Sequence, residues 1–142
     1  MARPDDAEKR FREGVNCAQA VLSTYGPALG LDEATALRLA SGLGGGVGRT
    51  GGTCGAALGA CMVISLRWGP SERGKSREEV TAKVGDFVDR FEARCGSVEC
   101  RTLLGRSIRT HEEHQKARED GVFKTKCPHF VRQAAEILEE FL

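Results

Sequence analysis

A glycine-rich segment runs directly into a long apolar stretch in the middle of this chain. Nine of the eighteen residues 42–59 are glycine, and Cys54 lies where the flexible part ends. The residues that follow are almost all apolar or small, and a helix that is apolar all round has to be buried by other elements. We therefore predict a central helix with Thr53 as its N-cap. Gly55 and Gly59 share one face of it, where a neighbouring backbone could approach closely.

The rest of the chain is also predicted to be helical, because no segment alternates like a strand. Between residues 5 and 25, apolar residues follow at spacings of four, three and four, which predicts one continuous helix ended by Gly26 and Pro27. Caps and glycines predict further helices at 33–41, 54–68, 77–95, 98–104, 111–120 and 128–142. We expect an all-α single domain over residues 1–142, a bundle of about five to seven helices around the central apolar helix.

Local signals set three of the expected helix starts. Ser76 with Glu79, and Thr110 with Glu113, have the spacing of a capping box, in which side chain and backbone exchange hydrogen bonds. Pro128 suits the first position of the last helix, because the N–H that proline lacks is not needed there.

Composition narrows the classes of partner. Hydrophobic residues make up 40% and charged residues 29% of the 142-residue chain, as in an ordinary globular protein. The formal net charge is only +1 and aromatic residues are 6%, so the chain has neither the basic surface nor the stacking residues of a nucleic-acid-binding protein. We expect no nucleic-acid partner and no attraction to an anionic membrane.

The location expected for the protein decides how its cysteines are interpreted. The first residues are polar and resemble no secretory signal, and the apolar run 54–66 is shorter than the roughly 20 residues that span a bilayer. These features predict a cytoplasmic protein without membrane insertion. In that reducing compartment, six cysteines favour metal binding or redox chemistry over static disulfides.

Three cysteines are expected at helix N-termini. Cys54 is predicted to begin the central helix, Cys100 lies in the first turn of a short helix, and Cys127 precedes Pro128 as the N-cap of the last helix. Unpaired amides and the helix dipole favour an anion at such positions, and they lower the pKa of a cysteine thiol.

The other three cysteines are expected in less activating places. Cys17 is predicted to lie in mid-helix at the edge of an apolar stripe, either in the core or facing a shared site. Cys61 lies two turns inside the apolar helix and is expected in the core. Cys95 falls at a helix C-terminus, where the dipole opposes a thiolate.

Four of these cysteines carry a family resemblance. Cys54 opens the C-G-A-x-x-G motif in TCGAALGA, Cys17 lies in EGVNCAQAVL, Cys100 in CGSVECRTLLG and Cys127 in KCPHFVRQAAEIL. In this order they resemble the C_GCAxxG_C_C family, a family of small redox-active proteins of about 140 residues with no established substrate. The resemblance implies that these four cysteines form the functional site.

Thiol–disulfide chemistry is our leading hypothesis for that site. Cys54 is the expected nucleophile, with Arg49 adding positive charge, and Cys100 or Cys127 is expected to resolve the mixed disulfide. No C-x-x-C pair is present. The redox partner is not identified by the sequence, and an apolar helix face could support a homodimer.

A metal centre is the second hypothesis. Cys17, Cys54, Cys100 and Cys127 could together ligate an iron–sulfur cluster or, less favoured, zinc. The backbone at Gly52, Thr53 and Gly55 is then expected to contact the cofactor. The spacings are wide, but ligands from separate helices can converge in a bundle core. No C-x-x-C-H motif for covalent haem occurs.

A phosphate-binding loop is the weakest hypothesis. The segment 46–51 matches G-x-G-x-x-G before a helix, but the strand that should precede it is missing. Of the histidines, His129 is expected in a solvated first turn, and His111 and His114 on an exposed helix face rather than in a metal site.

Overall fold

Helices account for nearly all regular structure in residues 3–142, the part of the chain that this computed structural model describes. They are α1 (Arg3–Arg12), α2 (Cys17–Tyr25), α3 (Glu33–Ala40), α4 (Gly55–Trp68), α5 (Glu78–Cys95), α6 (Cys100–Leu104), α7 (His111–Glu119), α8 (Val122–Leu138) and two 3-10 turns, η1 (Pro27–Leu29) and η2 (Glu139–Phe141). Over these residues the strand-like pairing is a single bridge between Thr53 and Glu99. The predicted all-α class is confirmed.

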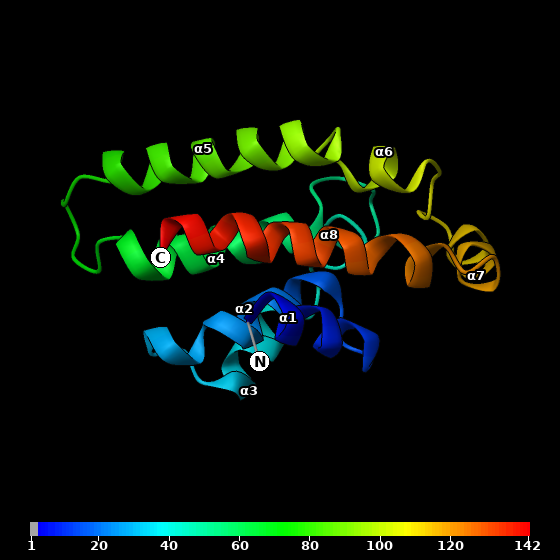
Figure 1. Ribbon diagram of the computed structural model, residues 1–142, viewed down its shortest axis with the longest axis horizontal. Coiled ribbons are helices and arrows are strands. Elements are labelled where there is room, and N and C mark those ends of the chain that lie inside the picture. Colours follow the sequence, from blue (N-terminus) through cyan, green and yellow to red (C-terminus); the bar gives the residue numbers. More distant parts are fainter. Residues whose placement is uncertain (1–2) are drawn as a thin grey trace.

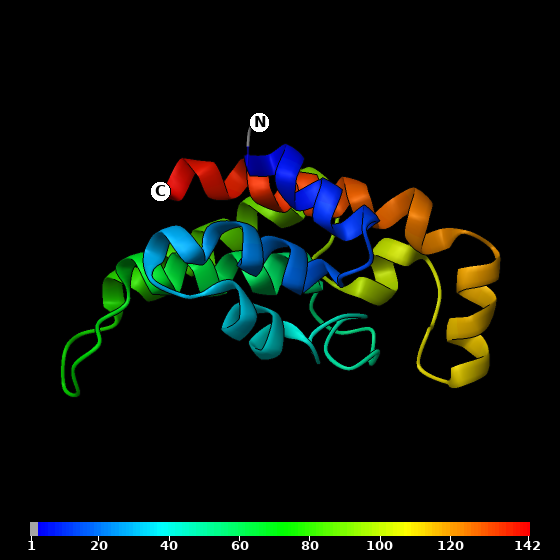
Figure 2. The ribbon, with the colours of Figure 1, turned by 90° about the horizontal axis from the view of Figure 1, so that it is seen from below.

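Helix α4 is the centre of the bundle, as its sequence predicts. It packs against α2, α5 and α8, and α5 and α8 run alongside it lengthwise (Figures 1 and 2). Its residues Ala56, Ala57, Ala60, Val63 and Ile64 have no exposed surface. The short helices α6 and α7 lie together at one end of the bundle (Figure 1).

The two glycines of α4 bring it against α2. A Cβ atom at Gly59 would lie 2.8 Å from the carbonyl oxygen of Ala18 and 3.1 Å from Cβ of Val21. One at Gly55 would lie 3.3 Å from the Ala18 amide nitrogen and 3.4 Å from Cβ of Cys17. The absent side chains are therefore what allows the two helix backbones to touch.

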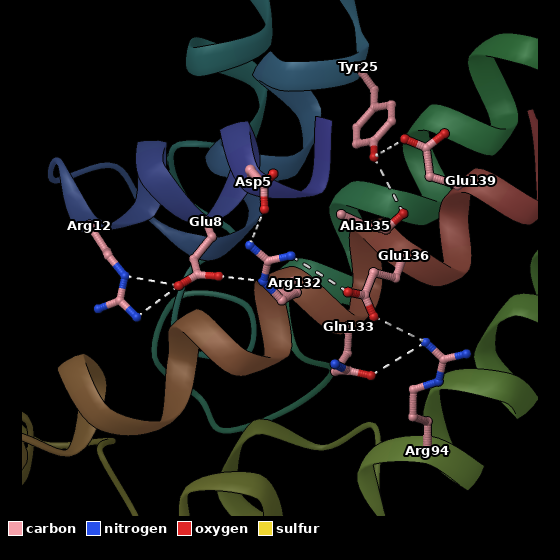
Figure 3. A network of polar contacts seen from close by, with 10 residues as sticks. All are labelled: Asp5, Glu8, Arg12, Tyr25, Arg94, Arg132, Gln133, Ala135, Glu136 and Glu139. Atoms are coloured by element: carbon pink, nitrogen blue, oxygen red, sulfur yellow. Dashed lines mark hydrogen bonds and ion pairs between the residues drawn. The ribbon is translucent and has the colours of Figure 1, made fainter. Parts of the chain in front are cut away.

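Arg132 of α8 holds α1 in place (Figure 3). Its Nε donates to Glu8 at 2.6 Å, and its guanidinium also pairs with Asp5. Glu8 is bound from its own helix by Arg12 at 2.8 Å. A second contact joins α2 to the end of α8: the Tyr25 hydroxyl donates a hydrogen bond to Glu139, the C-cap residue of α8, at 2.9 Å. Helices α1 and α2 are thus fixed to the long helix that carries Cys127.

The helix predicted over residues 5–25 is in fact two helices. Gly14 adopts φ of +121°, which ends the first, and Asn16 starts the second. The Asn16 side chain accepts from the Gln19 amide at 2.8 Å, and Gln19 returns a bond to the Asn16 amide at 2.9 Å. This capping box makes Cys17 the first residue of α2, not a mid-helix residue.

The last helix starts earlier than predicted. Gly121 is its N-cap and Val122 its first residue, so Pro128 lies inside α8 rather than at its start. Cys127 is therefore not an N-cap residue.

The predicted caps had mixed outcomes. Thr110 and Glu113 form the expected capping box. At α5, Ser76 instead accepts from the Glu78 amide at 3.2 Å and forms no box. At the central helix the N-cap is Cys54 itself, one residue later than Thr53.

No helix among the described residues has the length and apolar character needed to span a membrane.

We expect Gly59→Ala to destabilise the fold by about 2–3 kcal/mol, because the new methyl group overlaps the α2 backbone. Gly85→Ala is the matched control, since Gly85 also lies within a helix and a Cβ there meets nothing within 4 Å. The control should gain about 0.5–1 kcal/mol from helix propensity. Urea unfolding of both variants measures this. Equal stabilities would contradict the close approach of α2 and α4.

Candidate functional site: a cavity lined by four cysteines

Cys17, Cys54, Cys100 and Cys127 line one cavity of ≈ 500 Å³, named here the four-cysteine cavity. They come from the start of α2, the N-cap of α4, the start of α6 and the interior of α8. All four are free thiols, with Cys17 half-buried and the others buried. The cysteines of the C_GCAxxG_C_C pattern, which are up to 110 residues apart in sequence, thus share one space.

A short backbone pairing places Cys54 beside Cys100. The Cys54 amide donates to the Val98 carbonyl at 2.7 Å, and the Cys100 amide donates to the Gly52 carbonyl at 2.7 Å. These bonds flank the bridge between Thr53 and Glu99. Because side chains alternate along extended chain, the two cysteines project to the same face of the bridge. Of the residues predicted to contact a cofactor, Gly52 and Thr53 take part in this pairing, and Gly55 lines the cavity.

The glycine-rich loop forms one wall. Five successive residues, 45–49, have φ between +62° and +67°, a left-handed turn that three glycines make accessible. The amides of Gly48, Gly51 and Gly52 donate to carbonyls of the same loop at 2.9–3.1 Å. These amides are therefore satisfied internally, unlike those of a phosphate-binding loop, which face the ligand.

Gly46 fixes the distance between this loop and α6. A Cβ atom at Gly46 would lie 2.6 Å from Cβ of Cys100 and 2.6 Å from both the nitrogen and the oxygen of Gly52. Only a residue without a side chain fits between Cys100 and the strand-like segment that leads to Cys54.

Cys17 and Cys127 interact directly. The interaction with the neighbouring Cys17 thiol lowers the pKa of Cys127. Burial raises the pKa of Cys127 in part, while the positive charge of Lys126 lowers it further. The interaction with Cys127 and burial raise the pKa of Cys17 well above that of a free thiol. The pair therefore favours a Cys127 thiolate held by a protonated Cys17.

Cys54 and Cys100 remain protonated at neutral pH. Burial raises the pKa of Cys54 to about 11, although the amides of Ala56 and Ala57 act in the opposite direction. Burial and the nearby Cys54 raise the pKa of Cys100 to about 12. The prediction that helix N-termini would make these thiols acidic is wrong, because desolvation outweighs the helix-end amides.

The remaining lining is apolar inside and basic at the rim. Phe11, Leu103 and Ile108 contribute apolar surface, and the exposed Arg49 and Arg118 contribute charge.

His114 also lines the cavity, with its ring 5.0 Å from that of Phe123. It is half-buried rather than on an exposed face as predicted. Neither His114 nor Arg118 could be assigned to the cavity from the sequence, because the tertiary fold brings α7 to it.

The other sequence candidates lie elsewhere. Cys61 borders a separate apolar groove with Leu39 and Leu66, and Cys95 ends α5. His129 is exposed, as expected, but it lies in the interior of α8 and not in its first turn. In the region that the structure describes, no three Cys, His, Asp or Glu side chains are arranged to hold a metal ion.

Comparison with known families agrees with this geometry. The sequence profile of the family described as "Putative redox-active protein (C_GCAxxG_C_C)" matches residues 15–141. The chain belongs to this family. The family description assigns redox activity without naming a substrate or a cofactor. No curated protein and no solved structure gives a significant match.

We expect Gly46→Ala to cost about 2–4 kcal/mol of stability and to expose Cys100 to alkylation, because the methyl group would overlap Cys100 and Gly52. Gly48→Ala is the control. It carries the same left-handed φ, +62°, but its nearest atom would be 3.9 Å away, so only about 1–2 kcal/mol should be lost. Unfolding curves and site-resolved alkylation by mass spectrometry measure both effects. Similar behaviour of the two variants would refute this contact.

The thiol pair predicts a specific pH profile. Below pH 8, Cys127 should be alkylated faster in the reduced protein than Cys54 or Cys100, because it alone has a lowered pKa. Cys17→Ala removes the neighbouring thiol, so the pKa of Cys127 should rise and its alkylation should shift to higher pH. Cys17→Ser keeps a donor and should retain most of the effect. An unchanged profile in Cys17→Ala would show that Cys17 does not stabilise the thiolate.

Proposed function

We propose that the four-cysteine cavity carries the redox activity of this family member by thiol–disulfide exchange between Cys127 and Cys17. The observation that supports this most is that both thiols line one cavity and that each shifts the pKa of the other in opposite directions, which gives one nucleophilic sulfur and one adjacent resolving thiol. Thiol–disulfide exchange needs this combination. Cys127, not Cys54, is then the nucleophile.

The exchange balances without another oxidant or reductant. The Cys127 thiolate attacks one sulfur of a disulfide substrate, the substrate S–S bond breaks, and a substrate thiolate leaves. The Cys17 thiol gives its proton to that leaving group and attacks Cys127 Sγ, which releases the second substrate thiolate. The protein pair is oxidised to a disulfide, and the substrate is reduced to one thiol and one thiolate, which takes its proton from water.

Burial suits this chemistry. Around the pair, Phe11 and Phe130 line the cavity with apolar surface, which limits access of water to the mixed disulfide. Cys54 and Cys100 stay protonated and do not compete as nucleophiles. A cytoplasmic location, where thiols are kept reduced, is part of the proposal, as is an external reductant that returns the pair to dithiol.

An iron–sulfur cluster is the second candidate, because four thiols from four separate elements line one cavity. Among the described residues no three of these side chains are arranged to hold a metal ion, so the cysteines would have to move closer together to become ligands. Sulfur donors suit iron–sulfur clusters and zinc, and the amides of Ala56 and Ala57 lie near the Cys54 sulfur. Such a centre would supply one-electron transfer. It would need all four cysteines as ligands, whereas exchange between thiols needs Cys17 and Cys127.

Redox titration of single variants tests the proposal. In glutathione buffers of graded potential, followed by alkylation and mass mapping, we expect one disulfide, Cys17–Cys127. Cys127→Ser and Cys17→Ser should each abolish it. Cys61→Ser is the control and should leave it intact, because Cys61 lies outside the cavity. A disulfide between other cysteines, or none at any potential, would overturn the assignment.

A further inference from the structure

The charged residues of the four-cysteine cavity are all of one sign. Arg49 and Arg118 line it, and no aspartate or glutamate does so in the described part of the chain. The whole chain carries 20 acidic and 21 basic residues, so the imbalance belongs to the cavity and not to the protein. A cleft lined by one sign of charge concentrates ligands of the opposite sign.

Both arginines are available to a ligand. Arg3, Arg10, Arg12, Arg90, Arg94, Arg101, Arg106 and Arg132 pair with carboxylates. Within residues 3–142, neither Arg49 nor Arg118 makes an ion pair or a side-chain hydrogen bond to another residue. Burial lowers the pKa of His114, and the charges of Arg49 and Arg118 lower it further; all three residues line the same cavity.

The position of Arg49 supports a role for its side chain. It lies in the left-handed turn with φ of +63°, between Gly48 and Thr50, in a conformation that glycine adopts without strain. Residues held in such conformations are found preferentially at binding and catalytic sites. Val47 has a φ of +66° in the same turn, but of these two non-glycine residues only Arg49 lines the cavity.

We propose that Arg49 and Arg118 bind carboxylate groups of a small organic disulfide, so that the cavity takes anionic disulfides in preference to neutral or cationic ones. This inference rests on the proposed function for the reaction itself. A cavity of ≈ 500 Å³ has the size of a small-molecule site. Guanidinium groups recognise carboxylates through paired hydrogen bonds, and the thiol pair lies on the same cavity to receive the S–S bond.

Three disulfides of similar length test the charge preference: dithiodipropionate, bis(2-hydroxyethyl) disulfide and cystamine, which are anionic, neutral and cationic. Their rates with the reduced protein are divided by their rates with dithiothreitol. We expect the anionic disulfide to react fastest. Arg49→Gln and Arg118→Gln should each lower the ratio of anionic to neutral rates about two- to fivefold. Arg38→Gln is the matched control, an exposed arginine of α3 outside the cavity, and should not change the ratio.

Binding of suberate, an unreactive dicarboxylate of the same length, separates this inference from the proposed function. Calorimetric binding to the wild-type protein that weakens in Arg49→Gln and Arg118→Gln supports the anion site, even if no disulfide reacts. No suberate binding together with equal normalised rates for the three disulfides would overturn the anion site and leave the thiol pair standing. If Arg38→Gln weakened suberate binding as much as Arg49→Gln and Arg118→Gln do, the effect would come from the overall charge of the protein. That result would also overturn the anion site.

Discussion

The four-cysteine cavity depends on the close approach of α2 and α4. Gly55 lets the start of α4 lie against the start of α2, which places Cys17 near Cys54, and Gly59 continues the contact one turn later against Ala18. This gives a physical reading of the C-G-A-x-x-G motif. Its cysteine is the helix N-cap at the cavity, and its two glycines are the packing surface that brings a second cysteine to the same place.

The remaining two cysteines are positioned by different means. Cys100 is held by the backbone pairing to Gly52 and by the space left at Gly46, so the glycine-rich loop acts as a spacer between α4 and α6. Cys127 comes from within the long helix α8, which the ion pairs of Arg132 tie to α1. The four thiols therefore differ in acidity. The pKa of Cys127 is lowered, whereas the pKa values of the other three cysteines are raised. The charged residues that line the cavity are basic.

Much of this fold could be predicted from local patterns, and the family resemblance pointed to the four cysteines that line the cavity. Their places in the helices and their pKa values could not be predicted. The central helix and the Thr110 cap follow from sequence because they depend on neighbouring residues. Cys17 was expected inside a helix but begins α2, because the capping box at Asn16 interrupts an apolar stripe that looks continuous in sequence. Cys127 was expected at a helix N-cap but lies inside α8, because Pro128 is accommodated within that helix. The pKa of Cys54 was misjudged because burial is set by the whole fold and not by one helix end.

The most direct test of the central claim is the content of iron, zinc and acid-labile sulfide, with a visible spectrum, in protein purified without oxygen. Our account predicts a colourless protein free of metal and sulfide, with all six thiols titratable after unfolding. Iron and sulfide in the stoichiometry of a cluster, lost when any one of the four cavity cysteines is replaced by serine, would contradict the thiol pair and make the cavity a ligand set.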